Sequence, residues 1–339
     1  MEKINVLVTG IGGPTAQGVL RGLQEKGNVF AVGADRREIT SGNQFCDKTY
    51  QIPRYTDTDA YKNAIISIIK NENIHAIFPS LHEEIEIFKQ FRHELAIPVA
   101  LPVSSQFDVM TDKEKVYEFL AEKGLQSYIP NYAGFSRTED LRAIKADSFK
   151  DAERMVVKQV NGYGSLGFAI LTDRPAYLEA LKKGEKKVVN LDDYLDIPSE
   201  ERRIAMDYLD GTEFSVDLFL DEGKVVVAVP RERTGVSSGI VLDGKVVYNE
   251  ELIRAATEVA EALAEGGFLN LQFMTTDNGY KLTDVNARFC GSQVMSLGAG
   301  VNFPYLFLQY TVLGEKERPV PRWNTRMIRF RDHFFIYED

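Results

Sequence analysis

The chain has 339 residues, of which 44% are apolar and 27% are charged, an ordinary balance for a globular protein. At ~150 residues per domain, this length indicates two or three domains. The 50 acidic and 40 basic residues give a net charge of −10, which argues against a general nucleic-acid or anionic-membrane surface. Because Cys46 and Cys290 are the two cysteines, we expect neither a disulfide framework nor a thiolate zinc site.

The N-terminal residues lead directly into a strand-like run, so we expect no signal peptide. The longest apolar stretch, residues 225–229, is far shorter than the ~20 residues that a membrane helix needs. The composition therefore predicts a soluble, multidomain α/β protein of the cytoplasm, with no nucleic-acid partner and no membrane partner.

The first hundred residues alternate between strand and helix patterns. Short β-branched or apolar runs predict strands at residues 4–8, 30–33, 74–78 and 98–101. Helical patterns lie between them, as at residues 61–70, where four isoleucines supply a buried face. This alternation predicts a parallel sheet that is covered by helices on both faces.

A glycine-rich turn follows the first predicted strand. Gly10, Gly12 and Gly13 lie where the chain passes from strand to helix, and the helix N-terminus favours an anion. Asp35 ends the second strand and could meet a ribose hydroxyl, as in a dinucleotide site. The alternative is a tight turn in a Rossmann-like domain, because the third glycine position of the fingerprint is not cleanly filled.

The middle of the chain contains a capped helix and a glycine-rich hairpin. Thr111 or Asp112 can cap a helix that runs to about Lys123. A strand that ends at Lys158 then enters the loop 159–168, whose glycines could fold bare backbone N–H groups over phosphate oxygens. The alternative is a flexible hairpin with an ordinary exposed lysine.

Residues 205–229 predict a strand, a turn at Asp210-Gly211 and then a hairpin. Arg231 and Arg233 follow two residues apart on an extended segment, so they share one face and could clamp a phosphate or carboxylate. The alternative is an exposed sheet edge with solvated arginines. Asp217 could serve as a general base, although a strand-surface acid is the favoured interpretation.

A second hairpin, at residues 267–288, carries the most specific polar pattern. Asp284, Asn286 and Arg288 alternate along one strand, so they face one side, and Gln272 on the partner strand can meet them. Such residues are poor core material, whereas carboxylate and amide oxygens suit Mg²⁺. This pattern predicts a metal and phosphate site.

In motif order and content, the whole chain resembles the ATP-grasp superfamily, and most closely its carbamoyl-phosphate-synthetase-like and carboxylate–amine ligase members. The resemblance implies a Rossmann-like domain that usually carries no NAD, at residues 1–108. It also implies an ATP-grasp fold with two antiparallel-sheet subdomains, a central lid at 109–204 and a nucleotide- and metal-binding subdomain at 205–339.

The resemblance also implies a role for each matching residue. Lys113 and Lys158 would contact the ATP phosphates, and the glycine loop would close over them. The implied nucleotide-binding residues are Lys113, Lys158, Gly164, Ser165, Met206, Asp207, Tyr208, Leu209 and Glu213, with Glu213 at the ribose. The implied metal ligands are Gln272, Asp284 and Asn286 for Mg²⁺, with Mn²⁺ as an alternative ion. Arg288, Arg231 and Arg233 would hold the acyl substrate or the transferring phosphate.

Three residues depart from the family pattern. Asp284 replaces the usual Glu, and its side chain is one methylene shorter. Met206-Asp207 replaces a Gln-Glu pair, which should be tolerated because backbone groups read most of the base. Gln272 stands where many members have an acid, so one carboxylate and two amides would hold the metal.

The implied activity is that of an ATP-dependent ligase that joins a small-molecule carboxylate to an amine through an acyl phosphate, releasing ADP and phosphate. A phosphotransferase and a catalytically weak ATP sensor are the alternatives, and an NAD-dependent oxidoreductase ranks last because it leaves the polar strand of 284–288 unexplained. The oligomeric state stays open, with a homodimer as one expectation because members of the family are often dimers.

Overall fold

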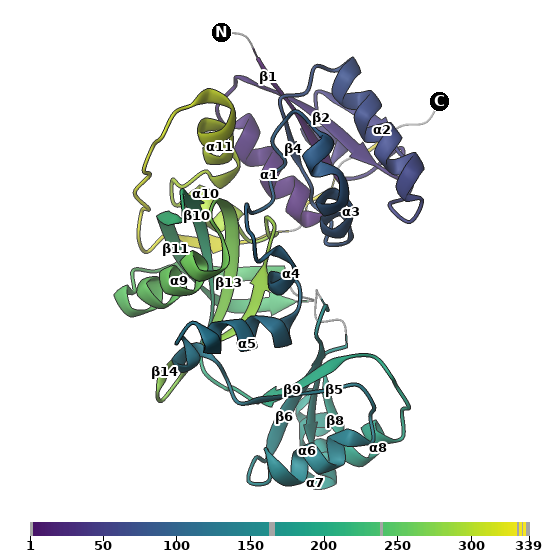
Figure 1. Cartoon of the computed structure of the whole chain (residues 1–339), viewed down its shortest axis with the longest axis vertical. Coiled ribbons are helices and arrows are strands. Elements are labelled where there is room, and N and C mark those ends of the chain that lie inside the picture. Colours follow the sequence, from purple (N-terminus) through teal and green to yellow (C-terminus); the bar gives the residue numbers. More distant parts are fainter. Residues whose placement is uncertain (1–2, 163–166, 238–239, 331, 334, 337–339) are drawn as a thin grey trace. The chain divides into compact units, whose positions relative to one another are not determined.

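The structure is a computed structural model, and it describes residues 3–162, 167–237, 240–330, 332–333 and 335–336 (Figure 1). The chain divides into two compact units. The first contains residues 1–107, 214–271 and 286–339, and the second contains residues 108–213 and 272–285. Each unit is therefore built from segments that are far apart in the sequence.

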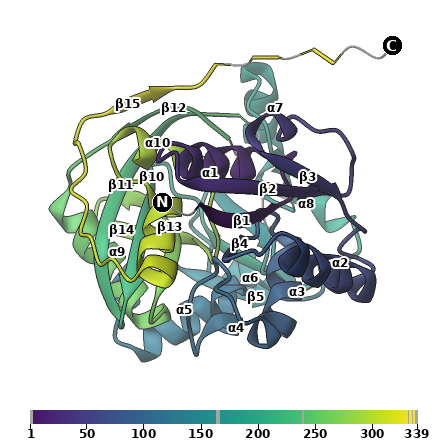
Figure 2. The ribbon, with the colours of Figure 1, turned by 90° about the horizontal axis from the view of Figure 1, so that it is seen from above.

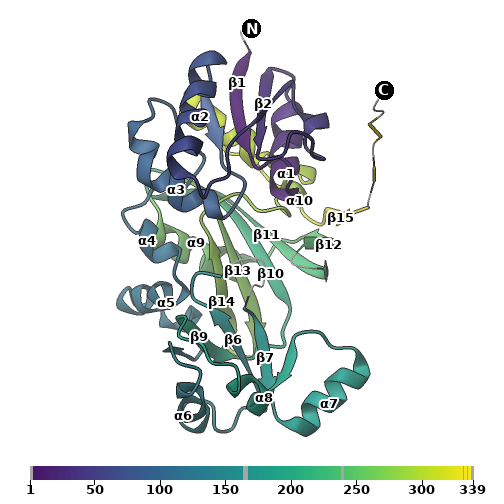
Figure 3. The ribbon, with the colours of Figure 1, turned by 90° about the vertical axis from the view of Figure 1, so that its right-hand side faces the viewer.

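A four-stranded parallel sheet opens the first unit, with strand order β3-β2-β1-β4. Its strands are β1 (Ile4–Thr9), β2 (Val29–Asp35), β3 (Lys48–Gln51) and β4 (Ala76–Phe78). Figures 2 and 3 show α1 (Pro14–Gln24) on one face of this sheet, with α2 (Thr58–Asn71) and α3 (Glu83–Phe91) on the other. The predicted parallel sheet with two covered faces is confirmed.

Two details of this sheet differ from the prediction. The predicted strand at 98–101 is reduced to a single bridge between Ile77 and Val99. Strand β3 was not predicted, because Lys48–Gln51 contains no buried residue and so carries no apolar pattern.

An antiparallel sheet with strands of different lengths follows, in the order β14-β13-β10-β11-β12-β15. Its strands are β10 (Glu213–Asp221), β11 (Lys224–Ser237), β12 (Ile240–Val246), β13 (Gly267–Thr276), β14 (Gly279–Asn286) and β15 (Arg326–Ile328). Both predicted hairpins, β10–β11 and β13–β14, are present. The division between the two units passes through β13, after Leu271, and through β14, after Val285.

Helices of the first unit complete its core. These are α9 (Glu250–Leu263), α10 (Val294–Gly298) and α11 (Phe303–Leu308), followed by a π-helical turn, Gln309–Leu313. Phe268 of β13 stacks on Phe289 at 4.3 Å between ring centroids, and Phe78 of β4 meets Phe307 at 5.4 Å. Side chains from the parallel sheet therefore share one hydrophobic core with residues from the C-terminal third of the chain.

The second unit contains a five-stranded sheet in the order β5-β9-β6-β7-β8. Its strands are β5 (Tyr132–Phe135), β6 (Arg154–Gln159), β7 (Ala169–Thr172), β8 (Val188–Asn190) and β9 (Arg203–Asp207). Its helices are α4 (Phe107–Met110), which begins at the last residue of the first unit, α5 (Lys113–Glu122), α6 (Asp140–Asp147), α7 (Arg174–Lys183) and α8 (Leu191–Leu195). Leu141, Val157, Leu171 and Ala205 lie in its core. The mixed α/β class with a parallel sheet followed by antiparallel sheets is as predicted.

Candidate active site

Helix α5 places Lys113 at its first position. Asp112 caps the helix, because its Oδ1 accepts hydrogen bonds from the backbone N–H groups of Glu114 and Lys115 at 3.1 and 3.2 Å. The other carboxylate oxygen of Asp112 pairs with Arg202 at 2.6 Å. The backbone N–H of Lys113 donates to the carbonyl of Val160 at 3.0 Å. The start of this helix is therefore fixed to the strand that carries the second predicted lysine.

Two groups hold the side chain of Lys113. Its Nζ donates to the carbonyl oxygen of Gly162 at 2.7 Å and lies 3.2 Å from Oδ1 of Asp284. Tyr117, one turn along α5, is buried and donates its hydroxyl to the carbonyl of Leu282 at 2.9 Å. Leu282 and Asp284 both belong to β14. Helix α5 thus contacts this strand at two places, through Tyr117 and through Lys113.

Lys158 reaches the same strand from β6. Its Nζ donates to the carbonyl of Thr283 at 2.6 Å, and Thr283 donates its hydroxyl to the carbonyl of Gln272 on β13 at 3.2 Å. The pKa of Lys158 is lowered to about 8, because burial and the neighbouring Lys113 lower it by more than the charges of Asp284 and Glu213 raise it. A nearby anion would therefore stabilise the charged form of Lys158.

The second unit thus brings Lys113, Lys158 and Asp284 close together. Two ammonium groups therefore lie near Asp284, and Glu213 also acts on one of them, Lys158. Lysine ammonium groups can bind phosphate.

The predicted adenine segment begins with the last two residues of β9, Met206 and Asp207. Met206 is buried and pairs with Tyr132 and Val156 of the neighbouring strands. The backbone N–H of Asp207 donates to the carbonyl of Asn131 at 3.1 Å, and the Asp207 carboxylate accepts from the backbone of Asn131 at 2.9 Å. These contacts fix the strand end, after which Tyr208 and Leu209 continue as a partly buried connection toward β10.

The remaining nucleotide candidates are Glu213, Gly164 and Ser165. Glu213 is the first residue of β10, and its charge partly opposes the burial that lowers the pKa of Lys158 and of Lys187 in the same unit. Gly164 and Ser165 lie outside the described residues. The hairpin to which they belong is present, since β6 and β7 pair antiparallel from Arg154 with Thr172 to Val157 with Ala169.

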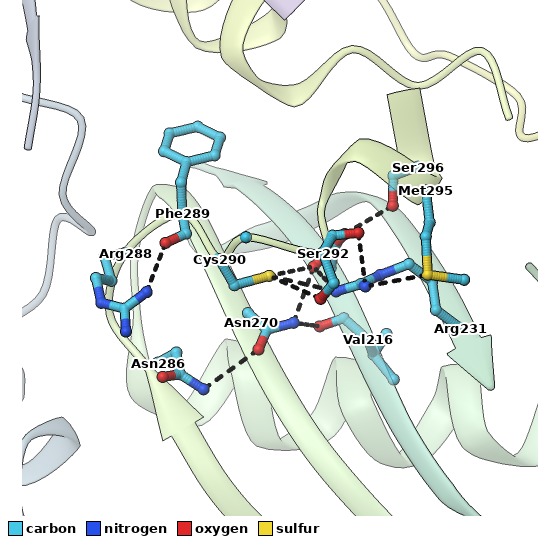
Figure 4. A network of polar contacts seen from close by, with 12 residues as sticks. Val216, Arg231, Asn270, Asn286, Arg288, Phe289, Cys290, Ser292, Met295 and Ser296 are labelled. Carbon is cyan, nitrogen blue, oxygen red and sulfur yellow. Dashed lines mark hydrogen bonds and ion pairs between the residues drawn. The ribbon is translucent and has the colours of Figure 1, made fainter. Parts of the chain in front are cut away.

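Asn286 and Arg288 belong to the first unit and continue the chain after Asp284. Figure 4 shows Asn286 beside Asn270 of β13, and the two side chains are joined by a hydrogen bond of 3.3 Å. Arg288 donates from its Nη1 to the carbonyl of Phe289 at 2.8 Å and is partly buried. Asn270 was not among the residues singled out from the sequence, although it alternates with Gln272 along β13.

Arg231 differs from the expectation of an exposed or substrate-facing guanidinium. Its side chain is 0% exposed, and its Nη2 donates to Oδ1 of Asp217, which is also 0% exposed, at 2.7 Å. The favoured interpretation of Asp217 as a strand-surface acid is therefore wrong. Arg231 can act on a site only through the residues that it holds, whereas Arg233, two residues along β11, is partly buried.

The dinucleotide site considered for the first unit depends on Asp35, and other contacts already occupy this carboxylate. Asp35 accepts hydrogen bonds from the backbone of Gly12 and from the backbone and Nε of Arg37, each at 3.0 Å. The guanidinium of Arg37 lies so close to Gly12 that a Cβ there would meet it at 2.0 Å. Although burial raises the pKa of Asp35, its hydrogen bonds and Arg37 outweigh this and lower the pKa below its usual value. The turn is thus held by an internal ion pair at the position where a ribose hydroxyl would bind.

Two family models match the chain. Residues 6–100 match the model "PylC-like, N-terminal domain", and residues 199–331 match "ATP-grasp in the biosynthetic pathway with Ter operon". The chain therefore contains an ATP-grasp domain after a PylC-like N-terminal domain. Of the three converging residues, Asp284 lies within the range that the ATP-grasp model matches.

The ATP-grasp relatives span several activities. The arginine-specific large chain of carbamoyl phosphate synthase from Bacillus subtilis is 25% identical over 278 residues, which is 78% of this chain and 25% of that protein. Among solved structures, the L-amino acid ligase from Bacillus licheniformis superposes with a TM-score of 0.64 at 17% identity, covering 92% of this chain and 74% of that one. The N5-carboxyaminoimidazole synthetase from Staphylococcus aureus, complexed with ADP, gives 0.67 at 15% identity, covering 97% and 81%.

These likenesses establish the fold. The chain spans a quarter or less of the length of the curated relatives that it matches. No helix among the described residues is both long enough and apolar enough to cross a membrane.

Proposed function

We propose that this ATP-grasp protein is an ATP-dependent ligase that activates a small-molecule carboxylate as an acyl phosphate and transfers the acyl group to an amine. The observation that carries the proposal is the convergence of Lys113 and Lys158 on Asp284, with Nζ–Oδ1 3.2 Å for Lys113 and Lys158 bonded to the adjacent Thr283. Relatives named as an L-amino acid ligase and an N5-carboxyaminoimidazole synthetase support the reaction class.

In this proposal, Lys113 and Lys158 offset the charge of the ATP phosphates. Backbone groups of Met206, Asp207, Tyr208 and Leu209 read the adenine, and Glu213 binds the ribose hydroxyls. Gly164 and Ser165 belong to a lid subdomain formed by residues 109–204. The other two parts of the proposed organisation are a Rossmann-like domain, residues 1–108, and a nucleotide- and metal-binding subdomain, residues 205–339. Closure of the glycine loop would keep water from the acyl phosphate.

The donor set also fits a divalent cation of the magnesium type. Gln272, Asp284 and Asn286 offer one carboxylate and two amide oxygens, and Mg²⁺ prefers a few such oxygens together with phosphate and water. Within the described ranges there is no group of three His, Cys, Asp or Glu residues that could hold a metal by itself. The phosphates would therefore supply much of the negative charge, and the ion, Mg²⁺ or Mn²⁺, would polarise them for transfer.

The chemistry itself needs positioning and charge more than a protein base. The substrate carboxylate attacks the γ-phosphorus in line, ADP leaves, and an amine then displaces phosphate from the acyl phosphate. Arg288 and Arg233 would stabilise charge on the transferring phosphoryl group, a role in which one cation can contribute a factor of ~10³. Arg231, enclosed around Asp217, would support this site as a positioning residue. We expect the protein to act in the cytoplasm, with a homodimer as its assembly.

The test is phosphate release from Mg-ATP with amino acids supplied singly and in pairs. Lys158→Met and Asp284→Asn are compared with Lys123→Met and Asp277→Asn, two exposed residues of α5's end and of the β13–β14 turn. Release that requires a pair of substrates and disappears in the first two variants supports the ligase. Phosphate retained on a product would indicate a phosphotransferase, Mg-ATP binding without turnover would indicate a sensor, and absence of nucleotide binding would overturn the proposal.

A further inference from the structure

A buried polar network surrounds Asp217 in the first unit (Figure 4). Oδ1 of Asp217 accepts from Nη2 of Arg231 at 2.7 Å and from Nδ2 of Asn270 at 2.8 Å. Oδ2 accepts from the hydroxyl of Ser296 at 2.7 Å. Asp217, Arg231, Asn270 and Ser296 are all essentially inaccessible to solvent. A carboxylate enclosed by these donors is fixed in position, and the guanidinium supplies a permanent opposite charge.

The network determines which way the amide of Asn270 points. An ionised carboxylate and a backbone carbonyl can only accept hydrogen bonds. Asn270 faces Oδ1 of Asp217 and, at 3.4 Å, the carbonyl of Val216. Its NH₂ group must therefore be on that side, and its Oδ1 must be on the opposite side.

The orientation of Asn270 in turn sets that of Asn286. Oδ1 of Asn270 lies 3.3 Å from the side-chain nitrogen of Asn286, so the NH₂ group of Asn286 is the partner that donates. The carbonyl oxygen of Asn286 is then turned away from Asn270. This is the atom that a divalent cation would need, because an amide binds a cation through its oxygen.

We infer that Asp217, through Asn270, is a positioning relay that makes Asn286 present its oxygen to the metal that accompanies ATP. The inference rests on the proposed function for the existence of that metal site, and it goes further by assigning a role to two buried residues outside the ligand set, Asp217 and Asn270. Arg231 and Ser296 belong to the relay only as partners that hold the Asp217 carboxylate.

Loss of such an outer hydrogen bond has a measurable consequence. Without Asn270 the amide of Asn286 can rotate between two orientations, and one of them presents an NH₂ group to the cation. Residues that orient metal ligands typically contribute 10–100-fold to metal affinity. We expect Asn270→Leu, which keeps the branched shape of the side chain without its polar atoms, to weaken the binding of the metal by about tenfold.

The experiment measures Mn²⁺ binding to the full-length protein with saturating ADP, from the electron paramagnetic resonance signal of free Mn²⁺. Ser296→Ala is the matched control, because it also removes one buried hydrogen bond to Asp217 but has no contact with Asn286. We expect Asn270→Leu to lose about tenfold in Mn²⁺ affinity and Ser296→Ala to stay within about twofold of the wild type. Asn270→Ser, whose hydroxyl cannot reach both neighbours, should behave like Asn270→Leu and serves if the leucine variant does not fold.

The outcomes separate the inference from the proposed function. Equal Mn²⁺ affinity in Asn270→Leu, Asn270→Ser and Ser296→Ala would overturn the relay while leaving the metal site in place. If the wild type binds no Mn²⁺ with ADP, the proposed function fails first, and the relay fails with it.

A second measurement tests the direction of the hydrogen bond. Asn286→Asp adds negative charge at the metal, but its carboxylate has no donor for Oδ1 of Asn270. We therefore expect Asn286→Asp to bring no gain in Mn²⁺ affinity in the wild-type background and a clear gain in the Asn270→Leu background. An equal effect in both backgrounds would contradict the relay.

Discussion

Lys113 and Asp284 form an ion pair, with Nζ of the lysine 3.2 Å from Oδ1 of the aspartate. Their side chains are 13% and 24% exposed. Each residue is proposed to serve a different part of Mg-ATP, since Lys113 binds phosphate and Asp284 binds the cation. In the nucleotide-free chain they neutralise one another. When nucleotide and metal bind together, the phosphates can pair with Lys113 and the cation can pair with Asp284. When nucleotide binds without the metal, Asp284 loses its partner and gains none.

The first prediction concerns Asp284→Asn. Removing the carboxylate frees Lys113 for phosphate, so ADP in the presence of EDTA should bind about two- to fivefold more tightly than to the wild type, because a partly exposed pair contributes up to ~1 kcal/mol. In the presence of Mg²⁺ the same variant should bind ADP more weakly, because the only carboxylate of the donor set is gone. Isothermal titration calorimetry under both conditions measures this reversal, with Asp277→Asn as the control. The same sign of change with and without Mg²⁺ would count against the assignment of Asp284.

The second prediction follows from the pKa of Lys158, which burial lowers to about 8. Phosphate oxygens stabilise the charged ammonium, so nucleotide binding raises this pKa and takes up a proton when the free lysine is neutral. Metal-free ADP affinity should therefore change little below pH 7.5 and fall as the pH rises through 8 to 9, by up to about tenfold per pH unit. Calorimetry in buffers of different ionisation enthalpy measures the proton uptake directly.

The controls for this titration are Lys158→Met and Lys123→Met. The first variant should bind ADP weakly and lose the proton uptake near pH 8, and the second should retain it. Proton uptake of the same size in Lys158→Met would assign the titration to another group.

Several features of the candidate site could be predicted because they follow from local rules of helix capping and strand alternation. Asp112 caps α5 as a short acceptor before a helical run, and this alone fixes Lys113 at the helix start. The alternation of Asp284 and Asn286 follows from the two-residue period of a strand. What periodicity cannot give is the meeting of α5, β6 and β14, because that depends on strand order and on contacts such as Tyr117 with Leu282.

The burial of Arg231 and Asp217 shows where local reasoning fails. The sequence of each strand would also allow its polar residues to face water. The sequence of one strand does not show that the other strand supplies the opposite charge. Their pairing arises from the register of β10 against β11, in which Ser215 is opposite Arg231, together with Asn270 from β13. Asn270 was missed because a single amide among apolar neighbours is ordinary until its partners are known.

The third prediction concerns Glu84, a buried carboxyl on α3. It accepts from the hydroxyls of Tyr61 and Thr9 at 2.6 and 2.7 Å and from the backbone of Ser80 and Leu81. Burial raises its pKa above 4.5 despite these bonds. The folded state therefore holds the proton more tightly than the unfolded chain, so this carboxyl contributes most to stability at low pH and loses that contribution as the pH rises through its folded pKa.

Glu84→Gln removes this titration while keeping the shape of the side chain. The difference in unfolding free energy, wild type minus variant, should therefore decrease as the pH is raised from 5 to 8. Urea unfolding at several pH values measures it, with Glu86→Gln on the exposed face of α3 as the control. A difference that stays constant or grows with pH would contradict the raised pKa of Glu84.

The fourth prediction concerns the buried pair of Asp217 and Arg231, in which Nη2 lies 2.7 Å from Oδ1 and both side chains are 0% exposed. Burial lowers the pKa of Arg231, but the charge of Asp217, Cys290 and the hydrogen bonds to both together outweigh burial and raise it. Arg231→Met leaves Asp217 as an unpaired buried charge, which should lower the unfolding free energy by about 3–5 kcal/mol.

Adding Asp217→Asn to Arg231→Met should restore part of that stability, because a neutral amide needs no counter-charge and can still accept from Asn270. We expect the double variant to be more stable than Arg231→Met by at least ~1 kcal/mol, although each substitution alone is destabilising. Urea unfolding of the wild type, both single variants and the double variant completes the cycle. Simple addition of the two losses would mean that the charges of Asp217 and Arg231 do not interact, which their distance and complete burial make the least expected result.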